Sequence, residues 1–432
     1  MPQKKSIAFH TLGCKLNFSE TSALARQLEP EEYVRTPFQE QADIYVINTC
    51  SVTENADREC RQLIRKVKKQ NPDSKVVITG CYAQLKPGEI AAMEHVDMVL
   101  GAAEKFQLPV HLQKLETAPD QKIYSCDIES VKGFESAYSL NDRTRTFLKV
   151  QDGCDYSCTF CTIPMARGHS RSDTIQGVLA NVKELASSGI QEVVLTGINL
   201  GDFGKGYNGN RQRNENFFDL MKVLDENDWI PRYRISSIEP NLLSPEMIEF
   251  IAGSKHIMPH LHMPLQSGSD TLLASMRRRY KREVYTDRVE RIKTMMPHAC
   301  IGVDVIVGYP GETEALFEET LDYLGGLDIS YLHVFTYSER PNTDAATYTE
   351  VVPIAIRRER NARLRKLSEL KMHQFTQHHL GQTRAVLFEH QEHNGYMEGY
   401  TDNYIRIRKF ADTEKMNRIC DECITLDSIQ TT

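Results

Sequence analysis

The sequence contains no apolar run that approaches the roughly 20 residues a membrane-spanning helix requires. Its first residues also lack the long apolar stretch and the small-residue cleavage site of a secretory signal peptide. These absences predict a cytoplasmic protein with no membrane partner. Hydrophobic residues make up 40% of the chain and charged residues 26%, a balance that is typical of a globular protein and argues against a disordered one.

A surplus of positive charge is missing as well, since the 432 residues carry a formal net charge of -7. A negative total argues mildly against a nucleic-acid partner, although the local distribution of charge decides such binding. No internal repeat or low-complexity tract is present. The length predicts about two to four domains.

Short β-branched runs alternate with helical segments at the start of the chain. The predicted strands cover residues 7–11, 43–49, 75–80 and 96–101. This alternation is typical of a parallel sheet in a doubly wound α/β domain, which we place at residues 4–116. A weak, polar pattern with one strand candidate near Ile123 follows, and we interpret residues 117–139 as a linker.

The central region, residues 140–372, repeats the strand–helix alternation about six times. Its predicted strands cover residues 146–150, 192–196, 233–237, 259–263, 302–307 and 331–335. Its predicted helices cover residues 175–187, 217–224, 245–252, 314–324 and a long basic segment from 354 to about 380. Six βα units predict an open, partial barrel rather than a complete eight-unit barrel.

Short strands separated by turn residues predict a small antiparallel β-barrel at residues 373–432. These strands cover residues 383–389, 395–401 and 404–408. Small β-barrels often bind oligonucleotides. From spacing alone, an RNA-binding module and a purely structural cap are equally open.

Cys154, Cys158 and Cys161 lie just after the first predicted strand of the central region. Three thiolates within eight residues can hold one face of a cubane iron–sulfur cluster and leave its fourth iron open to a substrate. A zinc site would need a fourth ligand, for which His169 is the candidate. Phe160, directly before the third cysteine, either fills the core or offers a stacking surface to an adenine. Active sites of such barrels lie at the carboxyl ends of strands, so the location favours chemistry.

Cys14, Cys50 and Cys81 each end a predicted strand and precede a helical segment. The carboxyl ends of parallel strands meet at one edge of a sheet, where ligands bind. These three cysteines are therefore expected to converge and to hold a second cluster, again with one open iron.

The other five of the eleven cysteines are interpreted as buried or incidental, since a cytoplasmic chain is not expected to form disulfides. They are Cys60, Cys126, Cys300, Cys420 and Cys423. The spacing of Cys420 and Cys423 leaves a metal or redox role open, but no second pair accompanies them.

Both cysteine triads stand in motifs that extend over nearly the whole chain. The motifs are Thr11–Asn17, Asn48–Cys50, Thr79–Cys81, Gln151–Gly168, Leu261–Ser269 and Gly308–Thr313. With them the chain resembles the radical S-adenosylmethionine (SAM) methylthiotransferases, and most closely their subgroup acting on threonylcarbamoyladenosine beside the tRNA anticodon. Met165-Ala166 departs from the family pattern, which more often has a tyrosine there.

The resemblance implies an α/β fold with three domains: an N-terminal methylthiotransferase domain, a radical SAM partial (β/α)6 barrel and a C-terminal TRAM domain. It implies two 4Fe-4S clusters and SAM as cofactors. One SAM would methylate sulfur at the N-terminal cluster, and a second would give the radical that abstracts hydrogen from adenine carbon 2 at tRNA position 37. Implied partners are tRNA, an electron donor such as flavodoxin or ferredoxin, and the iron–sulfur assembly machinery, and the family suggests a monomer.

Four residues at predicted strand ends are candidates for SAM contact: Thr196, Gly197, Glu239 and Gln266. A glycine at such a position permits close backbone approach to a ligand, but it also simply turns the chain. Glu239 and Gln266 either hold a ribose hydroxyl or brace a loop.

Basic character is concentrated in two runs despite the acidic total. The candidate RNA-binding residues are Arg277, Arg278, Arg279, Lys281, Arg357, Arg358, Tyr400, Tyr404 and Arg406. A charge run is usually a solvated helix face. Beside a β-barrel that contains Tyr400 and Tyr404, these runs favour a surface that follows phosphates and stacks bases.

Three alternative functions remain in view. The first two are the same chemistry on isopentenyladenosine in tRNA and on an aspartate of a ribosomal protein, which are the substrates of other subgroups of the family. A non-enzymatic iron–sulfur protein that senses redox state and binds RNA is the third, although it leaves the open iron of the central triad unexplained.

Overall fold

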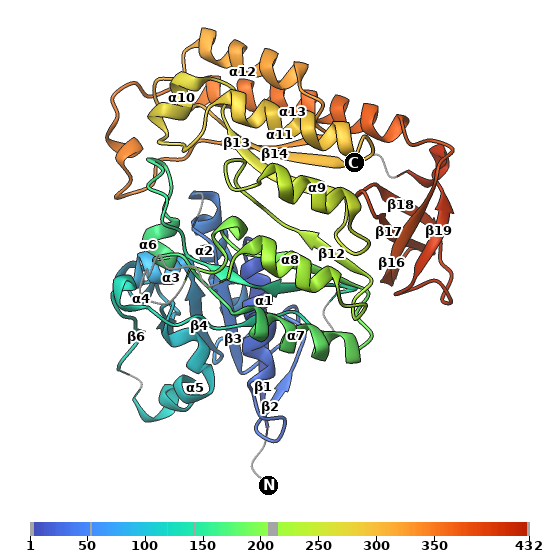
Figure 1. Ribbon diagram of the computed structural model, residues 1–432. Helices are drawn as coiled ribbons and strands as arrows, with labels where there is room; N and C mark the ends of the chain where they lie inside the picture. Colours follow the sequence, from blue (N-terminus) through green and yellow to red (C-terminus); the bar gives the residue numbers. More distant parts are fainter. Residues whose placement is uncertain (1–3, 52–53, 119, 141–142, 206–214, 430–432) are drawn as a thin grey trace.

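The computed structural model describes residues 4–51, 54–118, 120–140, 143–205 and 215–429. Three sheet-based parts follow one another along the chain, and Figure 1 shows the N-terminal sheet, the central barrel and the C-terminal strands in blue, green to orange, and red. None of the described helices is both long and apolar enough to cross a membrane.

The N-terminal part contains a parallel sheet of six strands in the order β2-β1-β3-β4-β5-β6. The strands are β1 (Lys5–Thr11), β2 (Tyr33–Arg35), β3 (Ile44–Thr49), β4 (Lys75–Gly80), β5 (Met98–Leu100) and β6 (Ile123–Tyr124). The strand order reverses between β1 and β3, and open α/β sheets bind ligands at such switch points.

Helices cover both faces of this sheet, as the alternating pattern predicts. The helices are α1 (Lys15–Arg26), α2 (Glu54–Gln70), α3 (Cys81–Leu85), α4 (Pro87–Ala91) and α5 (Leu108–Thr117). Apolar residues of α1 and α5 pack on one face, and those of α2, α3 and α4 pack on the other. The doubly wound arrangement is therefore confirmed.

The segment interpreted as a linker, residues 117–139, takes part in two sheets. Its strand β6 pairs with β5 at the edge of the N-terminal sheet. A second short strand, β7 (Ala137–Tyr138), pairs antiparallel with the first barrel strand. Each short strand adds to the edge of an existing sheet. The segment is therefore hydrogen-bonded through its backbone to both the N-terminal sheet and the barrel.

The central part is a partial barrel of six parallel strands. The strands are β8 (Arg145–Lys149), β11 (Glu192–Thr196), β12 (Arg232–Ile235), β13 (His260–Gln266), β14 (Cys300–Val307) and β15 (Tyr331–Thr336). Continuous pairing joins β8, β11 and β12 on one side and β13, β14 and β15 on the other. The two sides meet where the Ile238 amide donates to the His262 carbonyl oxygen at 3.1 Å.

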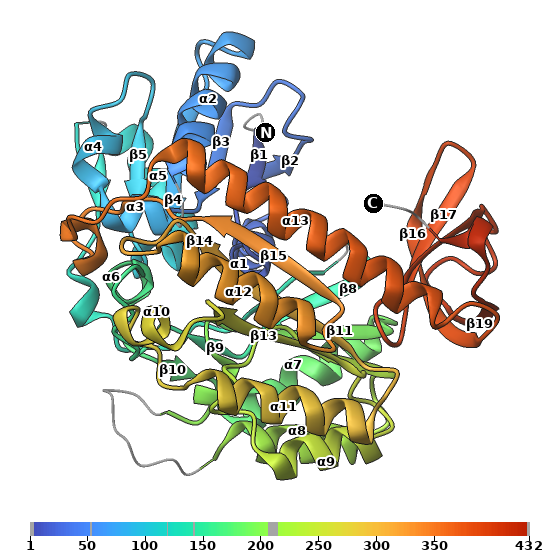
Figure 2. The same ribbon diagram turned by 90° about the horizontal axis from the view of Figure 1, so that it is seen from above.

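Helices connect and cover these strands in the order that the sequence predicts. They are α6 (Ile163–Arg167), α7 (Ile175–Ser187), α8 (Phe217–Asp225), α9 (Pro245–Gly253), α10 (Asp270–Ser275), α11 (Arg282–Met295), α12 (Glu314–Gly326) and α13 (Ile354–Gln377). Figure 2 shows α13 lying along β15 and leading to the C-terminal strands.

The C-terminal part is an antiparallel sheet in the order β18-β17-β16-β19. Its strands are β16 (Thr383–His393), β17 (Tyr396–Thr401), β18 (Arg406–Phe410) and β19 (Ile419–Cys423). An isolated bridge between Ile407 and Ile429 returns the end of the chain to β18. The sequence did not predict β19, which contains Cys420 and Cys423. Residues three apart on a strand point to opposite faces, so these two thiols do not form a pair.

Candidate active site

The three N-terminal cysteines lie at one edge of the parallel sheet. Cys14 follows β1, Cys50 follows β3, and Cys81 opens α3 directly after β4, so that the cysteines end three neighbouring strands. Glycines with left-handed backbone bring them together. A Cβ atom on Gly13 (φ +96°) would stand 2.6 Å from Cys50 Cβ, and one on Gly80 (φ +96°) would stand 2.3 Å from the Thr49 carbonyl oxygen. No other residue type fits this close approach.

Asn17 on α1 fixes two of these loops to each other. Its side-chain amide donates to the Leu12 carbonyl oxygen at 2.9 Å and to the Thr49 carbonyl oxygen at 3.1 Å. The Cys14 loop and the Cys50 loop therefore hold a set relative position before any cofactor binds. Burial raises the pKa of the Cys81 thiol, nearby Arg167 opposes that shift, and the neighbouring Cys14 adds to it.

The central cysteines lie on a loop that a short hairpin closes. The strands β9 (Gln151–Asp152) and β10 (Arg171–Ser172) pair antiparallel on either side of the loop. Cys154, Cys158 and Cys161 all line one cavity of about 1040 Å³. Burial raises the pKa of each thiol, to about 12 for Cys161. Bound metal deprotonates such thiols, so this donor set of three soft sulfurs fits an iron–sulfur cluster.

His169 does not complete a zinc site. Its Nδ1 lies 3.1 Å from the Asp155 carboxylate, and its Nε2 lies 2.9 Å from the Glu129 carboxylate. Among the described residues, no three histidine, cysteine, aspartate or glutamate side chains converge on a point where one metal ion would sit. A cubane cluster does not need such a point, because each thiolate binds a different iron.

Arg278 lies against the central cysteines and not on the surface. Its guanidinium donates to Cys158 Sγ at 3.2 Å and forms an ion pair with Glu239. Its side chain is 4% exposed, so the prediction that Arg278 binds RNA is wrong. Arg278 extends from the turn after α10 into the barrel, where the carboxylate and the thiol stabilise the buried cation. The same contact places Glu239 next to the cysteine loop, and burial raises the pKa of Glu239.

The end of strand β11 presents unpaired polar atoms at the carboxyl edge of the barrel. Thr196 is buried and its Oγ1 has no hydrogen-bond partner among the described residues. Both side-chain amide atoms of Asn199 are likewise buried without a partner in that part of the chain. Unpaired buried polar atoms are costly unless a ligand satisfies them. This edge therefore fits a polar cofactor such as SAM, and sequence reasoning missed Asn199 because a single asparagine in a loop carries no signal.

The structure also places the other three residues predicted to contact the cofactor, which are Gly197, Gln266 and Phe160. A Cβ atom on Gly197 would stand 2.8 Å from Gln151 Oε1, so the glycine makes room for Gln151. Gln266 ends β13 with φ +75° at an irregularity in its pairing with β14. Phe160 packs against the small core around Tyr309.

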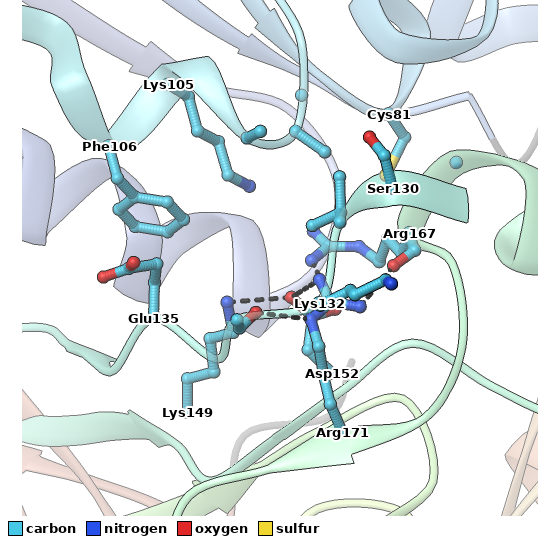
Figure 3. A pocket seen from close by; sticks show the side chains of 16 residues that line it. Cys81, Lys105, Phe106, Ser130, Lys132, Glu135, Lys149, Asp152, Arg167 and Arg171 are labelled. Atoms are coloured by element: carbon cyan, nitrogen blue, oxygen red, sulfur yellow. Dashed lines mark hydrogen bonds and ion pairs between the residues drawn. The ribbon is translucent and has the colours of Figure 1, made fainter. Parts of the chain in front are cut away.

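A buried ionic network joins the two cysteine sites. The Glu20 carboxylate of α1 forms ion pairs with Lys149 and Arg167, at N–O distances of 3.0 and 3.1 Å. It also forms an ion pair with Lys105. The Asp152 carboxylate forms ion pairs with the same two residues, at N–O distances of 2.8 Å for Lys149 and 2.9 Å for Arg167. Figure 3 shows Lys105 and Lys149 pointing into a cavity of about 260 Å³, with Cys81 at its edge. The network therefore positions the N-terminal cysteines relative to the central loop. Sequence reasoning missed it, because a glutamate in a polar helix segment looks solvent-exposed.

The predicted RNA-binding residues divide into buried and accessible ones. Arg357 is 4% exposed, and it forms an ion pair with Glu339 while donating to the Tyr337 carbonyl oxygen at 2.9 Å. Arg357 is therefore unavailable to a phosphate. The prediction that it binds RNA is wrong, because the face of α13 that carries Arg357 packs on the barrel. Arg277, Arg279, Lys281 and Arg358 are exposed.

Tyr400 and Tyr404 lie where the C-terminal sheet meets the other two parts. The Tyr404 ring stacks on the His260 ring of β13, with 4.0 Å between the ring centroids. Both tyrosines line a cavity of about 360 Å³ together with Cys14. Arg406 is partly buried and pairs with Glu398. The structure thus brings the two tyrosines next to the N-terminal cysteine site, which sequence reasoning did not predict.

Comparisons with known proteins agree with this architecture. Residues 6–101 match the model of a family described as uncharacterized protein family UPF0004, and residues 148–324 match the model of the radical SAM superfamily. Among solved structures, the chain is similar to the radical SAM methyltransferase TsrM from Kitasatospora setae, with a TM-score of 0.58 and 14% identity over 79% of this chain and 75% of that one. At this identity the likeness shows the fold alone.

The curated relatives are more similar in sequence. The chain is 38% identical over 418 residues to the threonylcarbamoyladenosine tRNA methylthiotransferase MtaB of Bacillus subtilis, covering 95% of this chain and 91% of the relative. It is 34% identical over 410 residues to the Thermotoga maritima protein of the same name, covering 93% and 91%. It is 32% identical over 432 residues to the tRNA-2-methylthio-N(6)-dimethylallyladenosine synthase of Staphylococcus epidermidis, covering 98% and 83%. With such identity over nearly its whole length, the chain belongs to the radical SAM methylthiotransferase family.

Proposed function

We propose that this protein is a tRNA methylthiotransferase that converts N6-threonylcarbamoyladenosine next to the anticodon to its 2-methylthio derivative. The observation that carries the proposal is the pair of cysteine triads at adjoining strand edges, linked by the Glu20 network. Relatives named for this reaction are 34 to 38% identical to the chain over more than nine-tenths of its length. The proposed substrate follows those names.

The residues have distinct roles in this proposal. Cys154, Cys158 and Cys161 would hold the SAM-binding 4Fe-4S cluster, and the N-terminal triad would hold the auxiliary one. When bound, the clusters and SAM supply the radical and sulfur chemistry that no side chain provides, since an aromatic C–H is not acidic enough for a side-chain base at neutral pH. Thr196 and Asn199 would bind SAM polar groups at the end of β11.

In this proposal each part of the chain has a separate role. Residues 4–116 would carry the auxiliary cluster, residues 117–139 would connect, residues 140–372 would bind SAM, and residues 373–432 would form the TRAM RNA-binding domain. Exposed Arg279, Lys281 and Arg358 are the basic candidates for phosphate contact. We further propose a monomer that works in the cytoplasm, receives electrons from a flavodoxin or ferredoxin, and obtains its clusters from the assembly machinery.

Nucleoside mass spectrometry of tRNA tests the proposal. Deletion of the gene is expected to abolish 2-methylthio-threonylcarbamoyladenosine, and restoring the gene is expected to bring it back. Loss of the isopentenyl derivative instead would keep the family and change the substrate. Unchanged levels of every methylthio nucleoside would favour a protein substrate or a non-enzymatic iron–sulfur role.

Arg278→Gln is expected to lower the reduction potential of the central cluster by roughly 30 to 100 mV, because a charge-assisted hydrogen bond to a ligand sulfur stabilises the reduced state. A redox titration followed by electron paramagnetic resonance measures the shift. Arg277→Gln is the matched control, since Arg277 is exposed and pairs with Asp344. An unchanged potential in an Arg278 variant that keeps its iron would contradict this role.

A further inference from the structure

A cavity beside Cys14 is built from all three parts of the protein. It has a volume of about 360 Å³. Its wall includes Cys14 and Lys15 at the start of α1, Arg145 and Arg234 from strands β8 and β12, and Tyr400 and Tyr404 from the C-terminal sheet. A ligand in this cavity would touch the N-terminal cysteine site, the barrel and the C-terminal sheet at once.

Positive charge in this cavity is only partly neutralised. Arg234 is satisfied by Glu192, with N–O distances of 3.0 and 3.1 Å. Arg145 lies over the Tyr400 ring at 4.1 Å, and its ion pair with Glu389 spans 3.4 Å. The Lys15 ammonium is exposed to the cavity and makes no hydrogen bond or ion pair with any described residue.

The ionisation of Tyr404 reports the same excess of positive charge. Burial by itself would raise the pKa of this phenol, but Arg145, Lys15 and Arg234 outweigh burial and lower it. The cavity therefore stabilises a negative charge that none of the described side chains fully supplies.

We propose that Lys15 and Arg145 bind the carboxylate of the threonylcarbamoyl group and so select this substrate. The inference rests on the proposed function and adds the residues that recognise the threonylcarbamoyl group. A threonyl carboxylate is ionised at neutral pH and accepts charge-assisted hydrogen bonds from an ammonium and a guanidinium. An isopentenyl group is apolar and would leave the Lys15 ammonium without an anionic partner, which disfavours it strongly.

An RNA phosphate offers the same negative charge to Lys15 and Arg145. The two sources differ in what happens when the carboxylate alone is neutralised. Changing the carboxylate to an amide removes one charge from the modified base and leaves every phosphate in place.

The experiment compares three anticodon stem-loop RNAs of one sequence, carrying threonylcarbamoyladenosine, its primary amide analogue or unmodified adenosine. Dissociation constants are measured with the holoenzyme. The wild-type protein is expected to bind the carboxylate form roughly 10- to 100-fold more tightly than the amide form, which is the effect of one hydrogen bond between charged groups. In Lys15→Met this preference is expected to fall to within about threefold. Arg145→Gln serves as a second variant if the first fails to fold.

Lys255→Met is the matched control, because Lys255 is exposed in the loop before β13 and does not line the cavity. It should keep the full preference. Equal binding of the acid and the amide by the wild-type protein would overturn the proposal without any variant. Equal weakening of all three RNAs by Lys15→Met would assign the anion to a phosphate and also overturn it. Failure of the proposed function is distinguished by the tRNA nucleoside analysis, which does not depend on these affinities.

Discussion

Replacing Cys154, Cys158 and Cys161 together by alanine is expected to reduce methylthiolation to the uncatalysed rate, a loss of at least about a millionfold. The physical reason is that the reaction breaks an aromatic C–H bond for which the side chains offer no substitute chemistry. Product is measured by mass spectrometry of RNA incubated with the purified protein, SAM and a reductant. Iron and sulfide content should fall to about half, since the N-terminal triad keeps its own cluster.

A complementary variant separates the two sites. Replacing Cys14, Cys50 and Cys81 by alanine is expected to abolish methylthiolation while reductive SAM cleavage continues at the central loop. Cys423→Ala is the control, because Cys423 is exposed on strand β19, away from both triads. Retained product formation in either triple variant would refute the assignment of two clusters.

Glu20→Ala is expected to destabilise the protein by about 3 to 5 kcal/mol. Glu20 is fully buried and pairs with Lys105, Lys149 and Arg167, so its removal leaves buried cations with less compensating charge. Urea denaturation followed by circular dichroism measures the change. Glu31→Ala is the matched control, because Glu31 is exposed, and its effect should stay within about 0.5 kcal/mol.

The stability contributed by Glu20 is expected to depend on pH. Burial alone would raise the pKa of this carboxyl, but Arg167, Lys105 and Lys149 outweigh burial and lower it. The unfolded chain therefore binds a proton at a higher pH than the folded protein does. The difference in unfolding free energy between wild type and Glu20→Gln should be constant above about pH 4.5 and shrink as the pH falls below that value. A difference that grows in acid would contradict the predicted sign.

Local patterns in the chain were enough to predict the strands that carry the cysteines. Strand β4 covers the predicted residues 75–80, and β3 (Ile44–Thr49) lies within the predicted residues 43–49. Buried parallel strands are continuous apolar runs, and the residue that follows each run lies at the sheet edge. The positions of Cys14, Cys50 and Cys81 at neighbouring strand ends were therefore readable from the sequence.

The charged residues were harder to place. Arg278 and Arg357 belong to basic runs that look like solvated faces, yet each is buried against a carboxylate from a distant segment. Strand β19 escaped prediction because Asp421 and Glu422 interrupt its apolar pattern, and pairing with β16 defines it. Such outcomes depend on partners far away in the chain, which a local pattern does not contain.

Fold class, cysteine placement and family motifs thus followed from residues read one segment at a time, since backbone propensity and strand–helix alternation act over short distances. Packing of the three parts created the Glu20 network and the cavity of Lys15, Arg145 and Tyr404. Charge burial and cavity shape arise only when distant segments meet, because desolvation and Coulomb attraction depend on distance in space.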